Sequence, residues 1–262
     1  MIDTHTHIYF PEFEEEYDAL IERCKKSGVS HFILPNVDEE SLPSLKAMHA
    51  LFPGNTSMAV GLHPTEVKDN WTLVVDSMES EAQTGNYVAI GEVGIDLYWD
   101  KSTLDFQKQA FERQLRIAEK LSLPVIIHSR NAIEETMDMI EKVKPSVPLI
   151  FHSFTGNAQD VGRIRKDCDP YFGINGVVTY KNAQELRDSL KKIGIDKILL
   201  ETDSPYLTPV PYRGKRNESS YLPHIRDKIA ECIDLTPVEV EEITDINAKR
   251  IFKIVNDPSL HT

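Results

Sequence analysis

The stretch Val125-Ile126-Ile127-His128-Ser129-Arg130 is a short apolar run that ends in a histidine. Its apolar residues follow one another without polar alternation, which is typical of a strand buried on both faces of a parallel sheet. Similar runs recur along the chain. The predicted strands lie at about residues 1–7, 29–36, 57–62, 87–92, 124–128, 147–152, 171–175 and 197–202.

Helical periodicity fills the segments between these runs. Apolar residues from 13 to 24 share one helical face, and Gly28 then favours a helix end. Comparable patterns occur within 68–85, 102–118 and 222–232. Eight strands interleaved with helices predict an α/β protein with the (β/α)8 TIM-barrel architecture, and the alternative is a doubly wound open sheet. We expect residues 1–262 to form a single domain, with the last few residues as a tail.

Composition limits the partners that this chain can have. Its 262 residues are 40% hydrophobic and 27% charged, which is ordinary for a globular protein with a sizeable core. The net charge of −13 argues against a general basic surface for nucleic acid, so attraction to a phosphate polymer must be local. The sequence shows neither a basic-then-apolar leader nor an apolar run of about 20 residues, and we expect a cytoplasmic protein without membrane contact.

Polar side chains with metal-binding chemistry sit at the ends of the predicted strands. Parallel barrel strands deliver their carboxyl ends to one rim, where barrel enzymes carry their active sites. Imidazoles and carboxylates brought together there would form a metal centre. The candidate metal ligands are His5, His7, Glu92, His128, His152 and Asp203.

Barrel geometry divides these ligands into two sites. The eighth strand of a closed barrel neighbours the first, so we expect Asp203 to face His5 and His7. His128 and His152 follow adjacent strands and form a second pair, with Glu92 beside them as a bridge. Two divalent ions would bring the pKa of bound water to about 7. Glu92 and Asp203 are therefore the candidate catalytic carboxylates, and Asp203 is placed to take the proton of that water.

Six motifs in order along the chain resemble the TatD-related deoxyribonucleases of the amidohydrolase superfamily. They are His5-Thr6-His7, Gly61-Leu62-His63-Pro64, Gly91-Glu92-Val93-Gly94-Ile95-Asp96, His128-Ser129-Arg130, His152-Ser153-Phe154-Thr155-Gly156 and Glu201-Thr202-Asp203-Ser204-Pro205. The stretch from Pro211 to Glu218 looks like the family's late loop, and Ser219 departs from it where a proline often follows. The resemblance implies a TIM barrel, a metal-dependent hydrolase acting on DNA ends, and the same six metal ligands.

Further polar residues near the strand ends are candidates for substrate contacts. His63 would hydrogen-bond a phosphate, or else serve a structural role, and Asp96 would position substrate or support a ligand. Arg130, together with Arg213 and Lys215 of the late loop, would grip phosphate oxygens, although such loop cations are also common as solvated surface. Glu201 shares a strand face with Asp203, and we expect it to hydrogen-bond a metal ligand.

Aromatic side chains also lie beyond the ends of the strands. Tyr98, Trp99 and Phe154 would stack on bases or simply cover the hydrophobic core.

The leading functional prediction is a two-metal phosphodiesterase, a 3′–5′ exonuclease on single-stranded DNA ends. Its polarity is implied by the resemblance alone. The alternative is a dinuclear amidohydrolase acting on a small amide, lactone or phosphate ester, since a fold does not determine a function. A third hypothesis is a metal-bound protein without catalytic activity. Four imidazoles favour Zn²⁺, whereas the resemblance implies Mg²⁺ or Mn²⁺, so the metal stays open.

Overall fold

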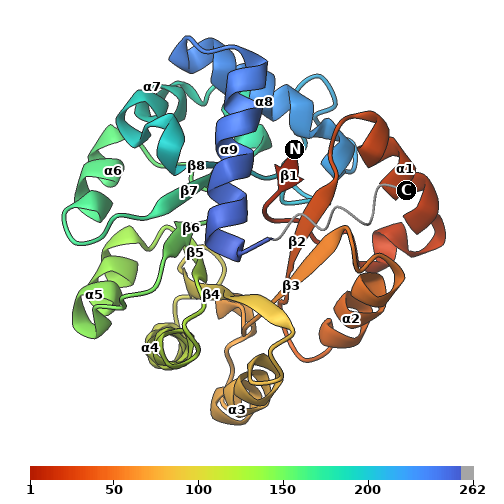
Figure 1. Ribbon diagram of the computed structural model, residues 1–262. Coiled ribbons are helices and arrows are strands. Elements are labelled where there is room, and N and C mark those ends of the chain that lie inside the picture. The colour runs from red at the N-terminus through yellow and green to blue at the C-terminus, as the bar shows by residue number, and fades with distance from the viewer. Residues whose placement is uncertain (255–262) are drawn as a thin grey trace.

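Eight parallel strands surround a common axis in the computed structural model, which describes residues 1–254 (Figure 1). Each strand is hydrogen-bonded to the next one along the chain. The strands are β1 (Ile2–Asp3), β2 (His31–Pro35), β3 (Thr56–Val60), β4 (Tyr87–Asp96), β5 (Val125–Arg130), β6 (Leu149–Phe151), β7 (Tyr171–Ile174) and β8 (Ile198–Leu200).

Backbone hydrogen bonds join the first and last strands and close the sheet. The N–H of Thr4 donates to the carbonyl oxygen of Leu200 at 2.9 Å. Just beyond, the N–H of Asp203 donates to the carbonyl oxygen of His5, also at 2.9 Å. The predicted TIM barrel is therefore confirmed, and the doubly wound open sheet is excluded.

Helices alternate with the strands and form the outer layer (Figure 1). They are α1 (Tyr17–Lys26), α2 (Leu42–Leu51), α3 (Trp71–Ala82), α4 (Leu104–Leu121), α5 (Ile133–Val143), α6 (Ala158–Arg165), α7 (Gln184–Ile193), α8 (Leu222–Ile233) and α9 (Pro237–Phe252). Short 3-10 turns occupy Pro11–Glu16, Pro64–Glu66, Gly176–Thr179, Ile195–Lys197 and Ser219–Tyr221. Within residues 1–254 no helix is both long enough and apolar enough to cross a membrane.

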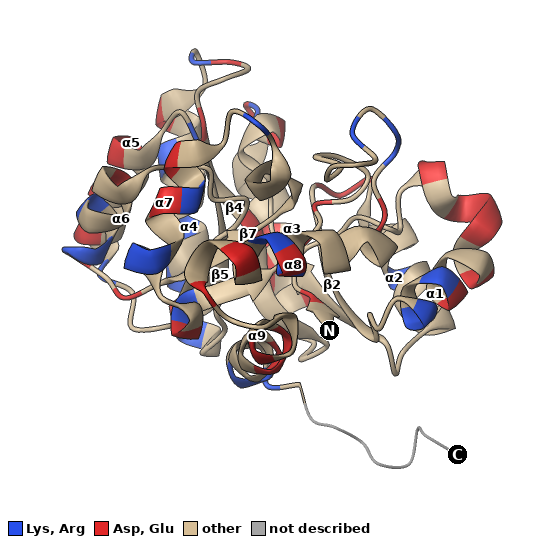
Figure 2. Ribbon diagram, turned by 90° about the horizontal axis from the view of Figure 1, so that it is seen from above, with Lys and Arg blue, Asp and Glu red and all other residues tan. Residues whose placement is uncertain are grey.

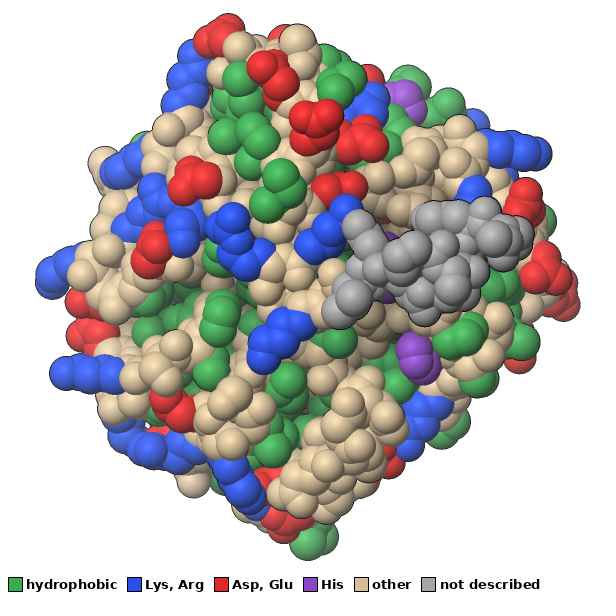
Figure 3. Space-filling view, viewed as in Figure 1, with side chains coloured by type: hydrophobic (Ala, Val, Ile, Leu, Met, Phe, Trp, Pro, Cys, Tyr) green, Lys and Arg blue, Asp and Glu red, His purple; other side chains and the backbone are tan. Residues whose placement is uncertain are grey.

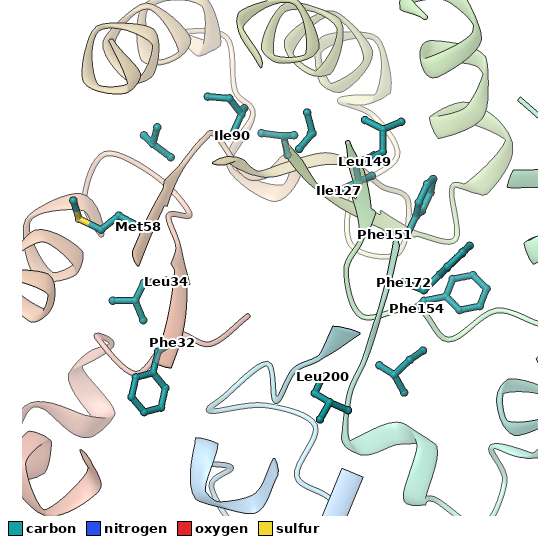
Figure 4. Close-up of a cluster of buried hydrophobic side chains, with 14 of the residues drawn as sticks. Phe32, Leu34, Met58, Ile90, Ile127, Leu149, Phe151, Phe154, Phe172 and Leu200 are labelled. Carbon is teal, nitrogen blue, oxygen red and sulfur yellow. The ribbon is translucent and has the colours of Figure 1, made fainter. Parts of the chain in front are cut away.

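Alternation along the strands builds two hydrophobic layers. Phe32 and Leu34 of β2 point outward to the helices, as do their counterparts on the other strands in Figure 4. The residue between them, Ile33, belongs to a separate cluster inside the barrel, with one residue from each of the other strands. The next inward position on β5 after Ile126 is His128, so the same alternation that builds the interior also aims the histidine inward.

Helix α9 covers the amino-terminal end of the barrel. Ile251 and Phe252 pack on the interior cluster, and the amide of Asn247 donates to the carbonyl oxygens of Ile195 and Ile198. In Figure 2 this helix lies on one side of the strands and long loops lie on the other. Figure 3 shows Lys and Arg mixed with Asp and Glu on the covered end. The opposite, carboxyl end of the strands is therefore the end available for a site.

Several strands are shorter than predicted, among them β8, which ends at Leu200 rather than at residue 202. Two further differences, in β1 and β4, affect the site. β1 covers only Ile2–Asp3, so both histidines lie in the irregular chain that follows it rather than on a strand through residue 7. β4 continues to Asp96, and its register shifts between Ile90 and Val93. This irregularity inserts an extra residue into β4. The alternation of side chains between the two faces therefore shifts by one position, and Glu92 and Asp96 face the interior. The expected carboxyl-terminal tail lies outside the described residues.

Candidate metal centre

The six predicted ligands lie together at the carboxyl end of the barrel. His5 and His7 follow β1, Glu92 lies in β4, His128 in β5, and the others follow β6 and β8. A cavity of about 1110 Å³ opens here, lined by five of the six ligands. The sixth, His5, is completely buried behind them. Side chains from positions 5 to 203 therefore converge at the bottom of one cavity.

Glu92 stands at the centre of this cluster and presents its two oxygens to different histidines. Its Oε2 lies 3.2 Å from Nε2 of His5 and 3.9 Å from Nε2 of His7. Its Oε1 lies 2.7 Å from Nδ1 of His128 and 3.4 Å from Nε2 of His152. One carboxylate therefore reaches both histidine pairs, which is the arrangement of a bridging ligand.

Asp203 faces the first histidine pair, as the barrel geometry predicts. Its Oδ1 lies 3.8 Å from Nε2 of His5 and 3.7 Å from Nε2 of His7, and these two nitrogen atoms are 3.2 Å apart. The backbone of Asp203 is left-handed, with φ of 57°, a conformation uncommon outside glycine, asparagine and aspartate. Asp203 is the third residue after β8, and its carboxylate lines the cavity.

Burial and mutual contact shift the protonation equilibria of these groups. Burial disfavours the charge on Glu92, but the imidazoles of His152, His63 and His5 outweigh it and hold the pKa of Glu92 well below its usual range. Burial lowers the pKa of His7 to about 4. Burial also raises the pKa of Asp203 to about 7, against the opposing effect of His152. The cluster thus pairs an anionic Glu92 with at least one neutral imidazole.

This set of donors fits divalent metal ions. Among residues 1–254, three groups place their ligand atoms within 4.8 Å of one another: His5, His7 and Glu92; His63, Glu92 and His128; and His5, His152 and Glu201. The rings of His5 and His152 stack with centroids 3.4 Å apart. Imidazoles packed this closely in a buried site repel one another when protonated, and neutral imidazole is the form that binds metal.

Carboxylates behind the cluster lie against two of the histidines. Oε1 of Glu201 accepts the N–H of Ser153 at 2.6 Å and lies 3.1 Å from Nδ1 of His152, close to this ligand but without the geometry of the predicted hydrogen bond. Oδ2 of Asp96 lies 2.8 Å from Nε2 of His128. Such contacts determine ring orientation and raise the basicity of the ligating nitrogen.

Asp3 supports the junction of the first and last strands from below. Its Oδ2 accepts the hydroxyl hydrogen of Thr202 at 2.6 Å, and its Oδ1 accepts the N–H of Thr202 at 3.0 Å and that of His5 at 3.4 Å. Burial raises the pKa of Asp3 to about 7. This carboxyl group therefore ties the backbone that carries His5 to the backbone that carries Asp203.

The candidate substrate contacts separate into two groups. His63, Asp96 and Arg130 line the cavity, and Nε2 of His63 lies 3.3 Å from Oε1 of Glu92, so His63 sits among the ligands. Arg213 and Lys215 are absent from the described cavity lining. The Arg213 guanidinium packs 4.3 Å from the centroid of Tyr180, and the Lys215 ammonium lies 5.6 Å from that of Tyr212.

Some supporting residues were not singled out from the sequence. Gly173 of β7 leaves the space that Glu201 occupies, since a Cβ there would lie 2.0 Å from Oε2 of Glu201. The side-chain oxygen of buried Gln107 in α4 accepts the backbone N–H of Asp96 at 2.8 Å, and its side-chain N–H donates to the backbone carbonyl oxygen of Asp96 at 3.1 Å. Asn217 donates to the carbonyl oxygens of Thr202 and Tyr206 at 2.8 and 2.6 Å. Gly173 stands out in the sequence as a small residue in an apolar run, whereas Gln107 and Asn217 lie among polar neighbours and give no such signal.

A closed parallel barrel with histidines and carboxylates converging at the carboxyl ends of its strands defines the class of metal-dependent hydrolases. Comparison with known proteins agrees with this class. The family model described as TatD related DNase matches residues 2–253, and the chain belongs to this family.

Similar proteins span the whole length of the chain. A Bacillus subtilis protein named uncharacterized metal-dependent hydrolase YabD is 36% identical, covering 97% of this chain and 99% of its own. The Yersinia pseudotuberculosis protein named 3′-5′ ssDNA/RNA exonuclease TatD is 32% identical, and the match covers 97% of this chain and 100% of that protein. The crystal structure of YjjV, a TatD homolog from Escherichia coli, superposes with a TM-score of 0.90 at 26% identity. The superposition covers 97% of this chain and 98% of that chain.

Proposed function

We propose that this chain is a 3′–5′ exonuclease that hydrolyses phosphodiester bonds at the ends of single-stranded DNA. The observation that carries the proposal is the position of Glu92, whose two oxygens face separate histidine pairs at the bottom of an open cavity. The direction of digestion and the single-stranded substrate rest on the names of relatives at about 32% identity, such as the Yersinia exonuclease.

The six ligands would hold two divalent ions, Zn²⁺, Mg²⁺ or Mn²⁺. His5, His7 and Asp203 belong to one site, His128 and His152 to the other, and Glu92 to both. When bound, two such ions supply hydroxide near neutral pH and neutralise the charge of the phosphate undergoing displacement.

The protein groups would position the reacting atoms and move one proton. Asp203 is partly exposed to the cavity and desolvation raises its pKa to about 7, so its carboxylate is placed to accept the proton of the attacking water. His63 lies beside Glu92 at the cavity wall and is placed to hydrogen-bond the phosphate or to join the metal ligands. Arg130, at the outer wall, would hold a phosphate further along the strand.

Digestion of labelled strands tests this function. Purified protein is incubated with single-stranded DNA labelled at its 5′ end, in the presence of Mg²⁺, Mn²⁺ or Zn²⁺. A 3′–5′ exonuclease shortens the labelled strand step by step, whereas the opposite polarity releases labelled mononucleotide at once. A strand of RNA in parallel establishes whether the sugar matters. Intact DNA with every metal would contradict the proposal.

The same protein preparation tests the amidohydrolase alternative. Hydrolysis of a dihydroorotate-like cyclic amide without any cleavage of DNA would favour it. The chain has Glu92 on β4 between the two histidine pairs, and its Yersinia relative is named a 3′-5′ ssDNA/RNA exonuclease, which favours the nuclease. We therefore expect no turnover of the amide.

A further inference from the structure

The wall of the cavity carries an exposed aromatic side chain next to a single arginine. Trp99 lines the cavity and 70% of its surface is exposed, and its neighbour Tyr98 is 53% exposed. Tryptophan and tyrosine are enriched at surfaces that contact a partner, because each combines a large apolar ring with a polar group. Among residues 1–254, Arg130 is the one Lys or Arg that lines this cavity.

Arg130 is held by aromatic contact rather than by an ion pair. Its guanidinium carbon lies 3.8 Å from the centroid of Tyr98 and 5.7 Å from that of Trp99. Arginines on the outer helices, such as Arg116 and Arg163, are paired with carboxylates. No carboxylate of the described chain lies within ion-pairing distance of Arg130. Its hydrogen-bonding edges therefore stay available to a ligand.

The carboxylates around the cavity increase the importance of Arg130 for binding an anionic substrate. Besides the metal ligands, the lining contains four further carboxylates at some distance from the cluster: Glu66, Glu134, Glu135 and Asp160. A phosphate entering the cavity would be repelled by these groups, and Arg130 is the lining cation that opposes them. Because a guanidinium binds a phosphate through two parallel hydrogen bonds, it would also orient the nucleotide.

The aromatic pair is fixed relative to the metal centre. Oδ1 of Asp96 accepts the backbone N–H of Tyr98 at 2.8 Å and that of Trp99 at 3.1 Å. The other oxygen of Asp96 lies 2.8 Å from Nε2 of His128. On the neighbouring strand, the N–H of Leu97 donates to the carbonyl oxygen of Arg130 at 3.0 Å. One carboxylate thus links a metal ligand to the backbone that presents both rings.

We infer that Trp99, Tyr98 and Arg130 form a nucleotide subsite, in which the exposed face of Trp99 stacks on an unpaired base while Arg130, supported by Tyr98, binds a phosphate of the same strand. The inference rests on the proposed nuclease function and adds to it the residues that would select an unpaired base. A base inside a duplex is already stacked on both sides, so only a base free of its neighbours offers a face to Trp99.

Tryptophan fluorescence tests the contact without requiring catalysis. The chain has two tryptophans, and the other, Trp71 of α3, packs partly buried against the core. In Trp71→Phe the emission comes from Trp99 alone. We expect a hydrolysis-resistant phosphorothioate octathymidylate to quench that emission in Trp71→Phe and to leave the emission of Trp99→Phe unchanged. Binding is followed separately by the anisotropy of a dye on the strand.

Kinetics on strands that lack one base locate the subsite. Stacking of one base on an aromatic side chain contributes roughly tenfold in affinity, so Trp99→Ala should raise KM for single-stranded DNA by about tenfold, with Trp99→Phe nearer to wild type. For the wild type, removing one base near the 3′ end should raise KM by a similar factor at one position. In Trp99→Ala, which already lacks the stacking ring, the same abasic strand should cause no further rise in KM.

Matched variants separate the subsite from general surface effects. Arg130→Gln should raise KM by about tenfold, whereas Lys101→Gln removes one positive charge from a neighbouring exposed loop position outside the described lining and should change KM less than twofold. Leu73→Ala is the control for Trp99→Ala, because Leu73 is also 70% exposed but lies on α3, outside that lining.

The outcomes distinguish this inference from the proposed function. If wild type digests DNA while Trp99→Ala has an unchanged KM and the strand binds without quenching Trp99, the subsite does not exist and the nuclease function stands. If the strand quenches Trp99 but no DNA is cleaved with any metal, the subsite stands and the proposed function fails. If the strand does not bind, the subsite is contradicted directly.

Discussion

Gly173 and Glu201 are adjacent in space because the glycine has no side chain. A Cβ on Gly173 would lie 2.0 Å from Oε2 and 2.5 Å from Cδ of Glu201. Glu201 in turn lies 3.1 Å from Nδ1 of His152. Gly173 therefore positions a candidate metal ligand that it does not touch, through the carboxylate that stands between them.

Replacing Gly173 with alanine should weaken metal binding. The added methyl group would push the Glu201 carboxylate away from His152, and loss of such a supporting contact lowers metal affinity about 10- to 100-fold. Calorimetric titration with Zn²⁺ and with Mn²⁺ measures the change. Gly162→Ala on α6 is the control, because a Cβ there meets only the mobile end of Lys192. Equal affinity in Gly173→Ala and Gly162→Ala would show that Glu201 does not orient His152.

Asp203→Asn should remove turnover and leave the fold in place. Asparagine tolerates the left-handed conformation that Asp203 adopts, at φ of 57°, so the backbone is expected to stay unchanged. The amide cannot accept the proton of the attacking water, and loss of such proton transfer costs about 10²- to 10⁴-fold in kcat. Single-turnover digestion of single-stranded DNA gives the rate, and thermal unfolding reports the fold. A variant with wild-type kcat would assign the proton transfer to another group.

Asn217→Ala should destabilise the loop that carries Asp203. The buried Asn217 amide donates to the carbonyl oxygens of Thr202 and Tyr206, and its removal leaves both acceptors without that donor. We expect the free energy of unfolding to fall by about 2–4 kcal/mol, measured by urea denaturation. Asn70→Ala is the control, since Asn70 is exposed and makes no side-chain capping bond at α3. Similar midpoints for the two variants would contradict this role of Asn217.

Acidification should destabilise the protein partly through His31. This side chain lies at the start of β2 with Nε2 2.9 Å from Oγ of Ser57, and burial lowers the pKa of His31 from 6.5 to about 4. Between these two values the unfolded chain binds a proton that the folded chain does not, so stability is complete above about pH 6.5 and falls as the pH drops towards about 4.

The variant His31→Gln isolates this contribution. Other groups titrate in the same range, so the quantity to compare is the loss of urea midpoint between about pH 7 and about pH 4.5 in the two proteins. We expect the loss to be smaller in His31→Gln. An identical loss would mean that His31 is protonated as readily in the folded as in the unfolded chain.

Local patterns in the sequence were sufficient for the barrel and for the convergence of the ligands. Runs such as Val125–Ile127 have no polar alternation, and a polar residue at the end of such a run marks the rim of the barrel. These features depend on neighbours within a few residues, which a single sequence displays.

Features that depend on distant contacts were not readable in this way. The register shift in β4, which turns Glu92 and Asp96 inward, arises where β4 pairs with β5. The path of the late loop depends on buried Asn217 and on Glu218, whose carboxylate binds Arg23 of α1 at 2.8 and 2.9 Å. For this reason the sequence assigns Arg213 and Lys215 to the late loop but does not predict whether they line the cavity.

We propose that Glu92 joins two metal sites through its two oxygens. Anomalous X-ray diffraction from crystals of the protein grown with Mn²⁺ tests it most directly. We predict two peaks of anomalous density per chain, one between Oε2 of Glu92 and His5 and His7, the other between Oε1 and His128 and His152. A single peak at full occupancy, or two peaks with Glu92 contacting only one of them, would contradict the account.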